Sequence, residues 1–198
     1  MKALLVTLST LSLLFAAALG LHVLLPPDLE RYEDKSKLVL ADDDSILRAF
    51  ISRDGMWRLP ASYNEVDEKY IEFLLAYEDK RYWSHFGVDP FALIRAAGQL
   101  IGSGAVVSGA STITMQVARL LEPRPRTITS KIIEVIRATQ LELMFSKKEI
   151  LSIYLTLAPF GGNIEGVKAA TLLYFNKLPV QLSVSEAALL VALPQSPA

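Results

Sequence analysis

The chain has 198 residues, a formal net charge of -1 and no cysteine. The missing cysteines exclude disulfides, thiolate catalysis and cysteine-ligated metal sites. Lysines and arginines are scattered, so no basic tail or overall positive field indicates a nucleic acid partner. Hydrophobic residues make up 52% of the chain and the mean hydropathy is +0.33, which is more apolar than one ordinary soluble domain requires.

Part of this apolar excess lies at the N-terminus, where Ala3–Leu25 contains no Asp, Glu, Lys or Arg. As a helix this run would span about 34 Å, against a hydrocarbon core of about 30 Å. We predict a single-pass signal anchor over residues 1–27, with the rest of the chain on the periplasmic or extracellular face of the inner (cytoplasmic) membrane. A signal peptide cleaved near Ala16–Ala18 is the main alternative, and a buried core helix is a third.

Residues 28–60 are predicted to be a linker and a small antiparallel β element. The charged segment Asp28–Lys37 is expected to be the linker, at the membrane surface. Turn residues separate three short extended runs, and Asp54-Gly55 is a hairpin signal. The acidic turn Asp42–Asp44 matches no EF-hand spacing, so we expect it to be solvated. The extended runs are Leu38–Leu40, Ile46–Ile51 and Met56–Leu59.

Residues 61–198 have helical patterns almost throughout and predict one mainly α domain. Capping boxes at Ser146–Glu149 and Ser183–Glu186 mark two helix starts. Asp89-Pro90 marks another, with Asp as the N-cap and Pro at the first helical position. The predicted helices are Tyr70–Ala76, Pro90–Ile101 (ended by Gly102–Gly104), Thr112–Leu121, Ile128–Phe145, Lys147–Leu157, Ile164–Phe175 and Val184–Leu193.

The first polar motif, Tyr77–Asp89, follows the buried helix directly and concentrates carboxylates, cations, aromatics and a histidine. The helix would carry Glu78 from the core to the rim of a cleft, where a carboxylate can act as a general base or acid. The alternative interpretation is a helix end with a solvated charge cluster.

Two further motifs supply neutral polar groups and cations. Gly109–Gln116 places Ser111, Thr112 and Gln116 at the start of a helix, where free N–H groups favour anions. Arg119 follows Gln116 by three residues and therefore shares its face. The alternative is an ordinary Ser/Thr cap on an amphipathic helix.

The third motif contains Lys131 and Glu134, which are three residues apart on one helix face. Taken alone, this pair is also typical of a surface ion pair of little energetic value.

In order, the chain shows EDKRYWSHFG, GASTITMQ, KIIE, KKEILSIYL followed by FGGNIEGV, and SVSEAALLVALPQSP. This order and spacing resemble the peptidoglycan glycosyltransferases of family 51, the polymerising domain of class A penicillin-binding proteins, from about Val39 to Ala198. The resemblance implies a lysozyme-like, mainly α fold. It also implies a cell wall enzyme that polymerises lipid II into glycan strands with inversion at the anomeric carbon.

The resemblance also implies roles for particular residues. Glu78 would be the base, and Glu134 would stabilise the leaving group or a bound divalent cation (Mg or Mn), no cofactor being required. His85 would be an orienting or structural residue. The positions expected to bind the substrate are Ser111, Thr112, Gln116, Arg119 and Lys131.

Four positions depart from the family pattern. Met115 stands where a glutamine is usual, Ser130 where an arginine is usual, and Thr156 where an asparagine is usual. Arg119 replaces a lysine and keeps the charge. Without this arginine and glutamine, the strength with which the diphosphate of a lipid-linked donor is bound is open. The expected base, Glu78, is unaffected.

The resemblance implies lipid II, the growing glycan strand and the membrane as partners, no nucleic acid, and other cell wall synthesis proteins as candidates. Two rival functions are a lysozyme-type glycan hydrolase and an inactive membrane-anchored fragment. Family members continue with further helices and a transpeptidase domain, and no SxxK, SxN and KTG set is found here. We therefore expect a C-terminally incomplete domain of low stability that penicillin does not acylate.

Overall fold

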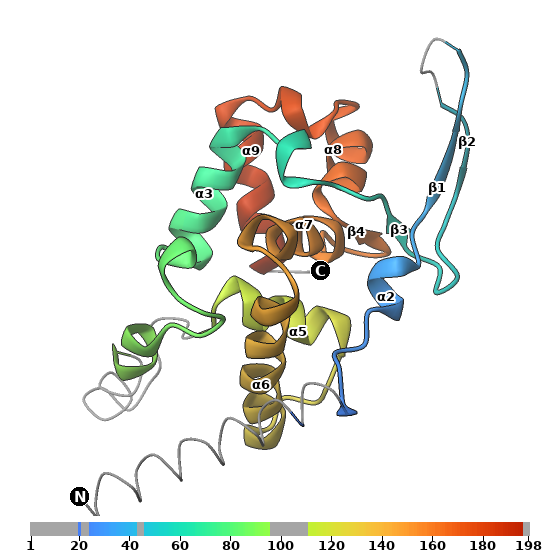
Figure 1. Ribbon diagram of the computed structural model, residues 1–198. Helices are drawn as coiled ribbons and strands as arrows, with labels where there is room; N and C mark the ends of the chain where they lie inside the picture. The colour runs from blue at the N-terminus through green and yellow to red at the C-terminus, as the bar shows by residue number, and fades with distance from the viewer. Residues whose placement is uncertain (1–19, 21–23, 43–45, 96–110, 196–198) are drawn as a thin grey trace, which may run out of the picture.

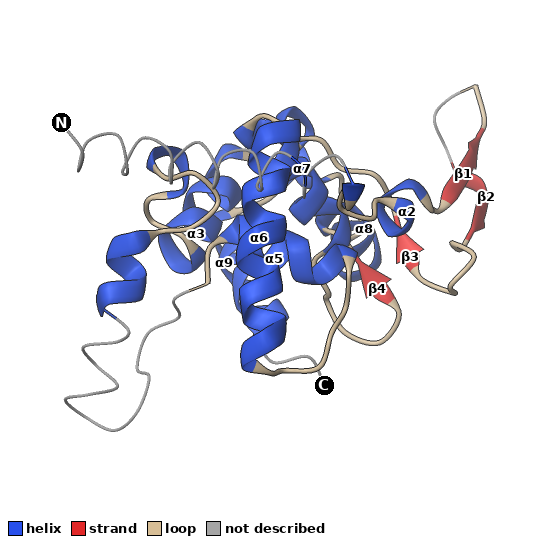
Figure 2. Ribbon diagram, turned by 60° about the horizontal axis from the view of Figure 1, so that its bottom comes forward, coloured by secondary structure: helices blue, strands red, loops and turns tan. Residues whose placement is uncertain are grey.

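The computed structural model describes residues 20, 24–42, 46–95 and 111–195. Helices form the body, and a two-stranded arm projects from one side (Figures 1 and 2). A further helical stretch covers residues 90–95. The labelled helices are α2 (Glu30–Glu33), α3 (Glu68–Glu78), α5 (Ile113–Leu121), α6 (Ile128–Met144), α7 (Lys147–Leu157), α8 (Val167–Phe175) and α9 (Val184–Ala192). The strands are β1 (Lys37–Leu40), β2 (Ile46–Phe50), β3 (Trp57–Arg58) and β4 (Ile164–Glu165).

The predicted signal anchor lies almost wholly outside the described residues. The end of the predicted helix at Gly102–Gly104 and most of the acidic turn Asp42–Asp44 lie outside them as well. Within the described ranges, no helix has both the length and the apolar character needed to cross a bilayer.

The core is built around α5, which packs against α6 and α7, while α3 packs against α9 (Figure 1). The side chains of Ile113, Met115 and Val117 on α5 are fully buried. Helix α7 is buried along most of its length, because its apolar residues lie on more than one face. The fully buried apolar residues of α7 are Ile150, Leu151, Ile153, Leu155 and Leu157.

The local capping signals are confirmed. Both predicted capping boxes form, with Ser146 and Ser183 as N-caps of α7 and α9. The predicted boundaries of α6, α7 and α9 agree with the structure to within one residue. These boundaries depend on contacts within one helical turn, so the sequence alone predicts them well.

The predicted antiparallel sheet of three runs is confirmed for its first two runs, because β1 and β2 pair antiparallel with Lys37 opposite Phe50, whereas Asp54-Gly55 does not form the predicted hairpin. Two neighbouring predictions were wrong. The run Met56–Leu59 does not join that hairpin, because β3 pairs in parallel with β4. The residues Ile164-Glu165 are this strand and are not the start of a helix, so α8 begins only at Val167, after Gly166 at φ +83°.

A buried ion-pair network explains why β3 pairs with β4. Arg58 is fully buried, and its Nε donates to Glu165 Oε2 at 2.6 Å. The same guanidinium donates to the carbonyls of Arg31 and Asp34 and pairs with Asp54. Arg31 also pairs with Glu165. The segment expected to be a linker therefore contains α2 and is fixed to the body by these contacts.

We predict that Arg58→Met destabilises the protein by about 3–5 kcal/mol, because it leaves the buried carboxylate of Glu165 with only the partly exposed Arg31 as an ion-pair partner. Arg53→Met is the matched control, since Arg53 is 74% exposed and pairs with Glu30 and Asp34 at the surface. That variant should change the free energy of unfolding by less than about 1 kcal/mol. Urea denaturation of both variants measures the difference, and equal losses would contradict the proposed role of the buried network.

Candidate active site

Glu78 is the last residue of α3, and its carboxylate meets the second polar motif. The amide Nε2 of Gln116 on α5 donates to Glu78 Oε2 at 2.8 Å. The structure therefore brings together two predicted site residues that are 38 positions apart in the sequence. The hydrogen bond fixes one oxygen of the carboxylate and so orients the candidate base.

Asp79, the residue after Glu78, ties the end of α3 to the start of α5. Its Oδ2 accepts the backbone N–H of Ile113 at 2.9 Å, and both of its oxygens lie 3.0 Å from His85 Nε2. Its side chain is only 3% exposed. A carboxylate at a helix N-terminus is stabilised by the unpaired N–H groups and the helix dipole. Asp79 therefore sets the position of Glu78 relative to α5.

His85 completes this contact from the first motif. Its ring is buried, and Nδ1 has no hydrogen-bond partner among the described residues. We assign the proton to Nε2, because it lies 3.0 Å from both oxygens of the Asp79 carboxylate, which can only accept hydrogen bonds. His85 is thus an orienting residue for Asp79, as the resemblance implies.

Thr112 uses its hydroxyl for structure. As N-cap of α5 it accepts the N–H of Met115 at 3.1 Å, and it donates to the carbonyl of Gly87 at 2.5 Å. Gly87 has φ +75°, and a Cβ there would lie 2.9 Å from the backbone of Ala138 on α6. Thr112 therefore holds the first motif against α6, and its expected role in substrate binding stays a prediction.

The third motif reaches the second through Lys131 on α6. Lys131 Nζ donates to Ser111 Oγ at 2.5 Å and to Glu134 Oε2 at 2.9 Å. The predicted residues Ser111, Lys131 and Glu134 thus form one connected group. In the described part of the chain, no three His, Cys, Asp or Glu side chains come together as a metal site.

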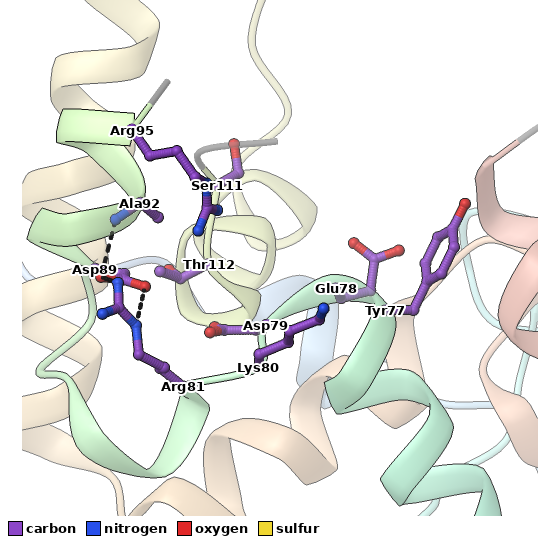
Figure 3. Close-up of a pocket in the computed structure, with 10 residues that line it drawn as sticks. All are labelled: Tyr77, Glu78, Asp79, Lys80, Arg81, Asp89, Ala92, Arg95, Ser111 and Thr112. Carbon is purple, nitrogen blue, oxygen red and sulfur yellow. Dashed lines mark hydrogen bonds and ion pairs between the residues drawn. The ribbon is translucent and has the colours of Figure 1, made fainter. Parts of the chain in front are cut away.

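A cavity of about 300 Å³ opens beside Glu78 (Figure 3). Of the predicted residues, it is lined by Glu78, Ser111 and Thr112. Gln116, Arg119, Lys131 and Glu134 lie outside its lining. The lining residues are Tyr77, Glu78, Asp79, Lys80, Arg81, Asp89, Ala92, Arg95, Ser111 and Thr112.

Three cations in this cavity were missing from the predicted site: Lys80, Arg81 and Arg95. Lys80 and Arg81 belong to the first motif, so their closeness to Glu78 in the sequence could have indicated that they line the site. Arg95 lies on the helical stretch 90–95, which we interpreted only through its apolar positions. Figure 3 shows its side chain extending toward Ser111.

Arg81 is held by Asp89, with Nε donating to Oδ2 at 2.9 Å. Asp89 also caps the stretch 90–95 by accepting the N–H groups of Phe91 and Ala92. Burial by itself raises the pKa of Asp89, but the hydrogen bonds from Arg81 and from these two N–H groups outweigh it and lower the pKa. The ionised carboxylate thus fixes one wall of the cavity.

Arg119 lies half-buried on α5, one turn after Gln116. Its charge acts on Tyr154, a buried residue of α7. Burial raises the pKa of Tyr154, Tyr70 and Glu78 raise it further, and Arg119 opposes them. Arg119 on α5 and Glu78 on α3 therefore shift the pKa of the same phenol in opposite directions.

The departures from the family pattern have structural explanations here. Met115 is fully buried in the core. The hydroxyl of Ser130 lies 2.9 Å from that of Thr127, the N-cap of α6. Thr156 accepts the N–H of Ala61 at 3.1 Å. None of the three side chains adds charge to the site.

Comparison with known proteins identifies the class. The family model described as Transglycosylase matches residues 43–198. The chain belongs to this family, as the resemblance of its motifs predicts.

The relatives are named as penicillin-binding proteins. The chain is 49% identical over 185 residues to penicillin-binding protein 1C of Escherichia coli, covering 93% of this chain and 24% of that protein. It is 43% identical over 142 residues to penicillin-binding protein 1A of Aquifex aeolicus, covering 71% of this chain and 20% of the relative. Identity to penicillin-binding protein 1F of Bacillus subtilis is 37% over 163 residues, with coverage of 82% and 22%. The chain thus spans about a quarter of these relatives or less.

Gly87→Ala should destabilise the protein by about 2 kcal/mol or more beyond the strain of the positive φ, because its Cβ would press on the backbone of α6. Gly55 provides the control, since it has φ +82° and nothing within 4 Å of an added Cβ. Gly55→Ala should cost only the backbone strain, about 1 kcal/mol. Thermal unfolding of both variants gives the comparison. If Gly87→Ala is no less stable than Gly55→Ala, the close approach to α6 is not what fixes this loop.

Proposed function

We propose that this domain is a peptidoglycan glycosyltransferase that polymerises lipid II into glycan strands. The observation that carries the proposal is the hydrogen bond between Gln116 and Glu78, which orients a carboxylate at the rim of a polar cavity. The connected group of Ser111, Lys131 and Glu134 supports it with a cation beside a helix N-terminus. Membership of the transglycosylase family agrees with this chemistry.

In this reaction a sugar hydroxyl of the acceptor lipid II attacks the anomeric carbon of the donor strand. A new C–O glycosidic bond forms while the bond from that carbon to the lipid diphosphate breaks, with inversion. The hydroxyl proton passes to the carboxylate of Glu78, the general base. The bond from Gln116 keeps this carboxylate in one orientation, so no reorientation is needed during the reaction.

The leaving diphosphate gains negative charge as its bond breaks, and fixed cations stabilise that charge. We assign this role to Lys131 and Arg119, with Ser111 as a neutral donor. Glu134 already pairs with Lys131 and holds it in place. Lys131 and Arg119 supply this positive charge directly, so we propose that no cofactor is required. A Mg or Mn ion bound at Glu134 would only add to the stabilisation of the leaving diphosphate.

We further propose that residues 1–27 anchor the chain in the inner membrane. Residues 28–60 then join this anchor to residues 61–198, which form a lysozyme-like catalytic domain on the outer face of the membrane. The support is the charge-free run Ala3–Leu25, which is long enough to cross a bilayer. A membrane location also suits a substrate with a lipid tail. Other cell wall synthesis proteins are the candidate protein partners.

Incubation with labelled lipid II and separation of the products tests the proposal, and we expect polymer. Glu78→Gln should reduce turnover by about 10²–10⁴-fold, because the proton acceptor is lost. Lys131→Ala should mainly raise KM for the donor, because it removes charge from diphosphate binding.

The control is Lys148→Ala, an exposed lysine on α7 away from the cavity, which should retain full turnover. Full activity of Glu78→Gln would rule out Glu78 as the base. Shortened strands from a preformed glycan would instead favour the hydrolase, and the absence of any product would favour an inactive fragment.

A further inference from the structure

Of the two cations that we assign to the diphosphate, Arg119 is the less firmly held. Lys131 is fixed by Ser111 and Glu134. The side chain of Arg119 forms no hydrogen bond or ion pair within the described ranges, so its position depends on that of its helix, α5. The contacts that set the end of α5 against α6 therefore also set the spacing between the two cations.

Glu122, three residues after Arg119, joins the end of α5 to α6. It is the C-cap residue of α5, and its side chain is only 11% exposed. Its Oε1 lies 3.0 Å from Nε of Arg137, which belongs to α6. Arg124 pairs with the same carboxylate. Two guanidinium groups thus bind a nearly buried carboxylate at the point where the end of α5 meets α6.

The N-terminal segment completes this contact. The N–H of Asp28 donates to Oε1 of Glu122 at 3.0 Å. The carbonyl of Leu25 accepts a hydrogen bond from Arg137. The two residues between them are prolines, whose rings restrict the backbone. Residues 25–28 therefore bind both partners of the ion pair, and we call them the strap.

The two ends of α5 have separate supports. At its start, Asp79 accepts the N–H of Ile113, and Gln116, which orients the candidate base, follows within one turn. At its other end, the carbonyl of Leu120 accepts a hydrogen bond from Arg31 of α2, so the N-terminal part of the chain again supplies the contact. Loss of the strap would therefore displace the cation at the end of α5 more than it displaces the candidate base.

We propose that Glu122 is a positioning residue for diphosphate binding, and that it acts through Arg137 and the strap. Glu122 does not contact the substrate. It holds the end of α5 so that Arg119 and Lys131 keep one spacing, because a diphosphate binds two cations together only where their spacing matches its own. The identity of this ligand rests on the proposed function.

The test measures KM and kcat for lipid II in Glu122→Gln, in Arg137→Met and in the double variant. We expect KM to rise about tenfold in all three, while kcat falls less than about threefold. A purely structural role would reduce the fraction of active protein, which lowers kcat and leaves KM unchanged, and that result would overturn the proposal. Additive effects in the double variant would overturn it too, since two residues that act through one contact are not additive.

Glu30→Gln is the matched control. Glu30 lies in the same N-terminal part of the chain, is 72% exposed and pairs with Arg53 at the surface. The same substitution there should leave KM and kcat unchanged, because an exposed pair contributes little.

Titration calorimetry with inorganic pyrophosphate separates this inference from the proposed reaction, because the titration needs no turnover. We expect Glu122→Gln to weaken pyrophosphate binding about tenfold, as Lys131→Ala should. An affinity that Glu122→Gln leaves unchanged, or no binding by the wild-type protein, would overturn the inference. A wild-type protein that binds pyrophosphate but makes no polymer would contradict the proposed reaction alone.

Discussion

The arrangement of the site depends on one carboxylate, that of Asp79. The backbone N–H of Asp79 caps α3 by donating to the carbonyl of Leu75, while its carboxylate accepts the N–H of Ile113 at the start of α5 and faces Nε2 of His85. Two helices and a loop therefore meet at a single buried side chain. Because Glu78 precedes Asp79 directly, the same contact sets where the candidate base lies relative to Gln116.

Features that depend on near neighbours could be predicted from the sequence. The capping boxes at Ser146 and Ser183, and the polar motif at Glu78, need only a few adjacent residues. The pairing of β3 with β4 could not be predicted, because it depends on a buried contact between Arg58 and Glu165, 107 positions apart. Thr112 shows the same limit at the site, since the hydrogen bond from its hydroxyl to the carbonyl of Gly87 joins residues 25 positions apart.

Helix α6 connects the parts of the account. It carries Lys131 and Glu134 to the site, and its backbone at Ala138 receives the tight turn at Gly87. Arg137 on the same helix holds the carbonyl of Leu25, where the apolar run leaves the body. One helix therefore links Lys131 at the candidate site, the loop that follows the candidate base, and the point where the apolar N-terminal run meets the body.

The most direct test of this account is the lipid II turnover of Asp79→Asn, measured alongside its melting temperature. Asparagine keeps the shape, but its NH2 group replaces one of the two oxygens that lie 3.0 Å from His85 Nε2, so a second donor would face Nε2–H. We predict a folded protein whose turnover falls by about 10²-fold, because a displacement of the base by about 1 Å has that effect. Unchanged turnover in a folded Asp79→Asn protein would contradict the claim that this carboxylate positions Glu78.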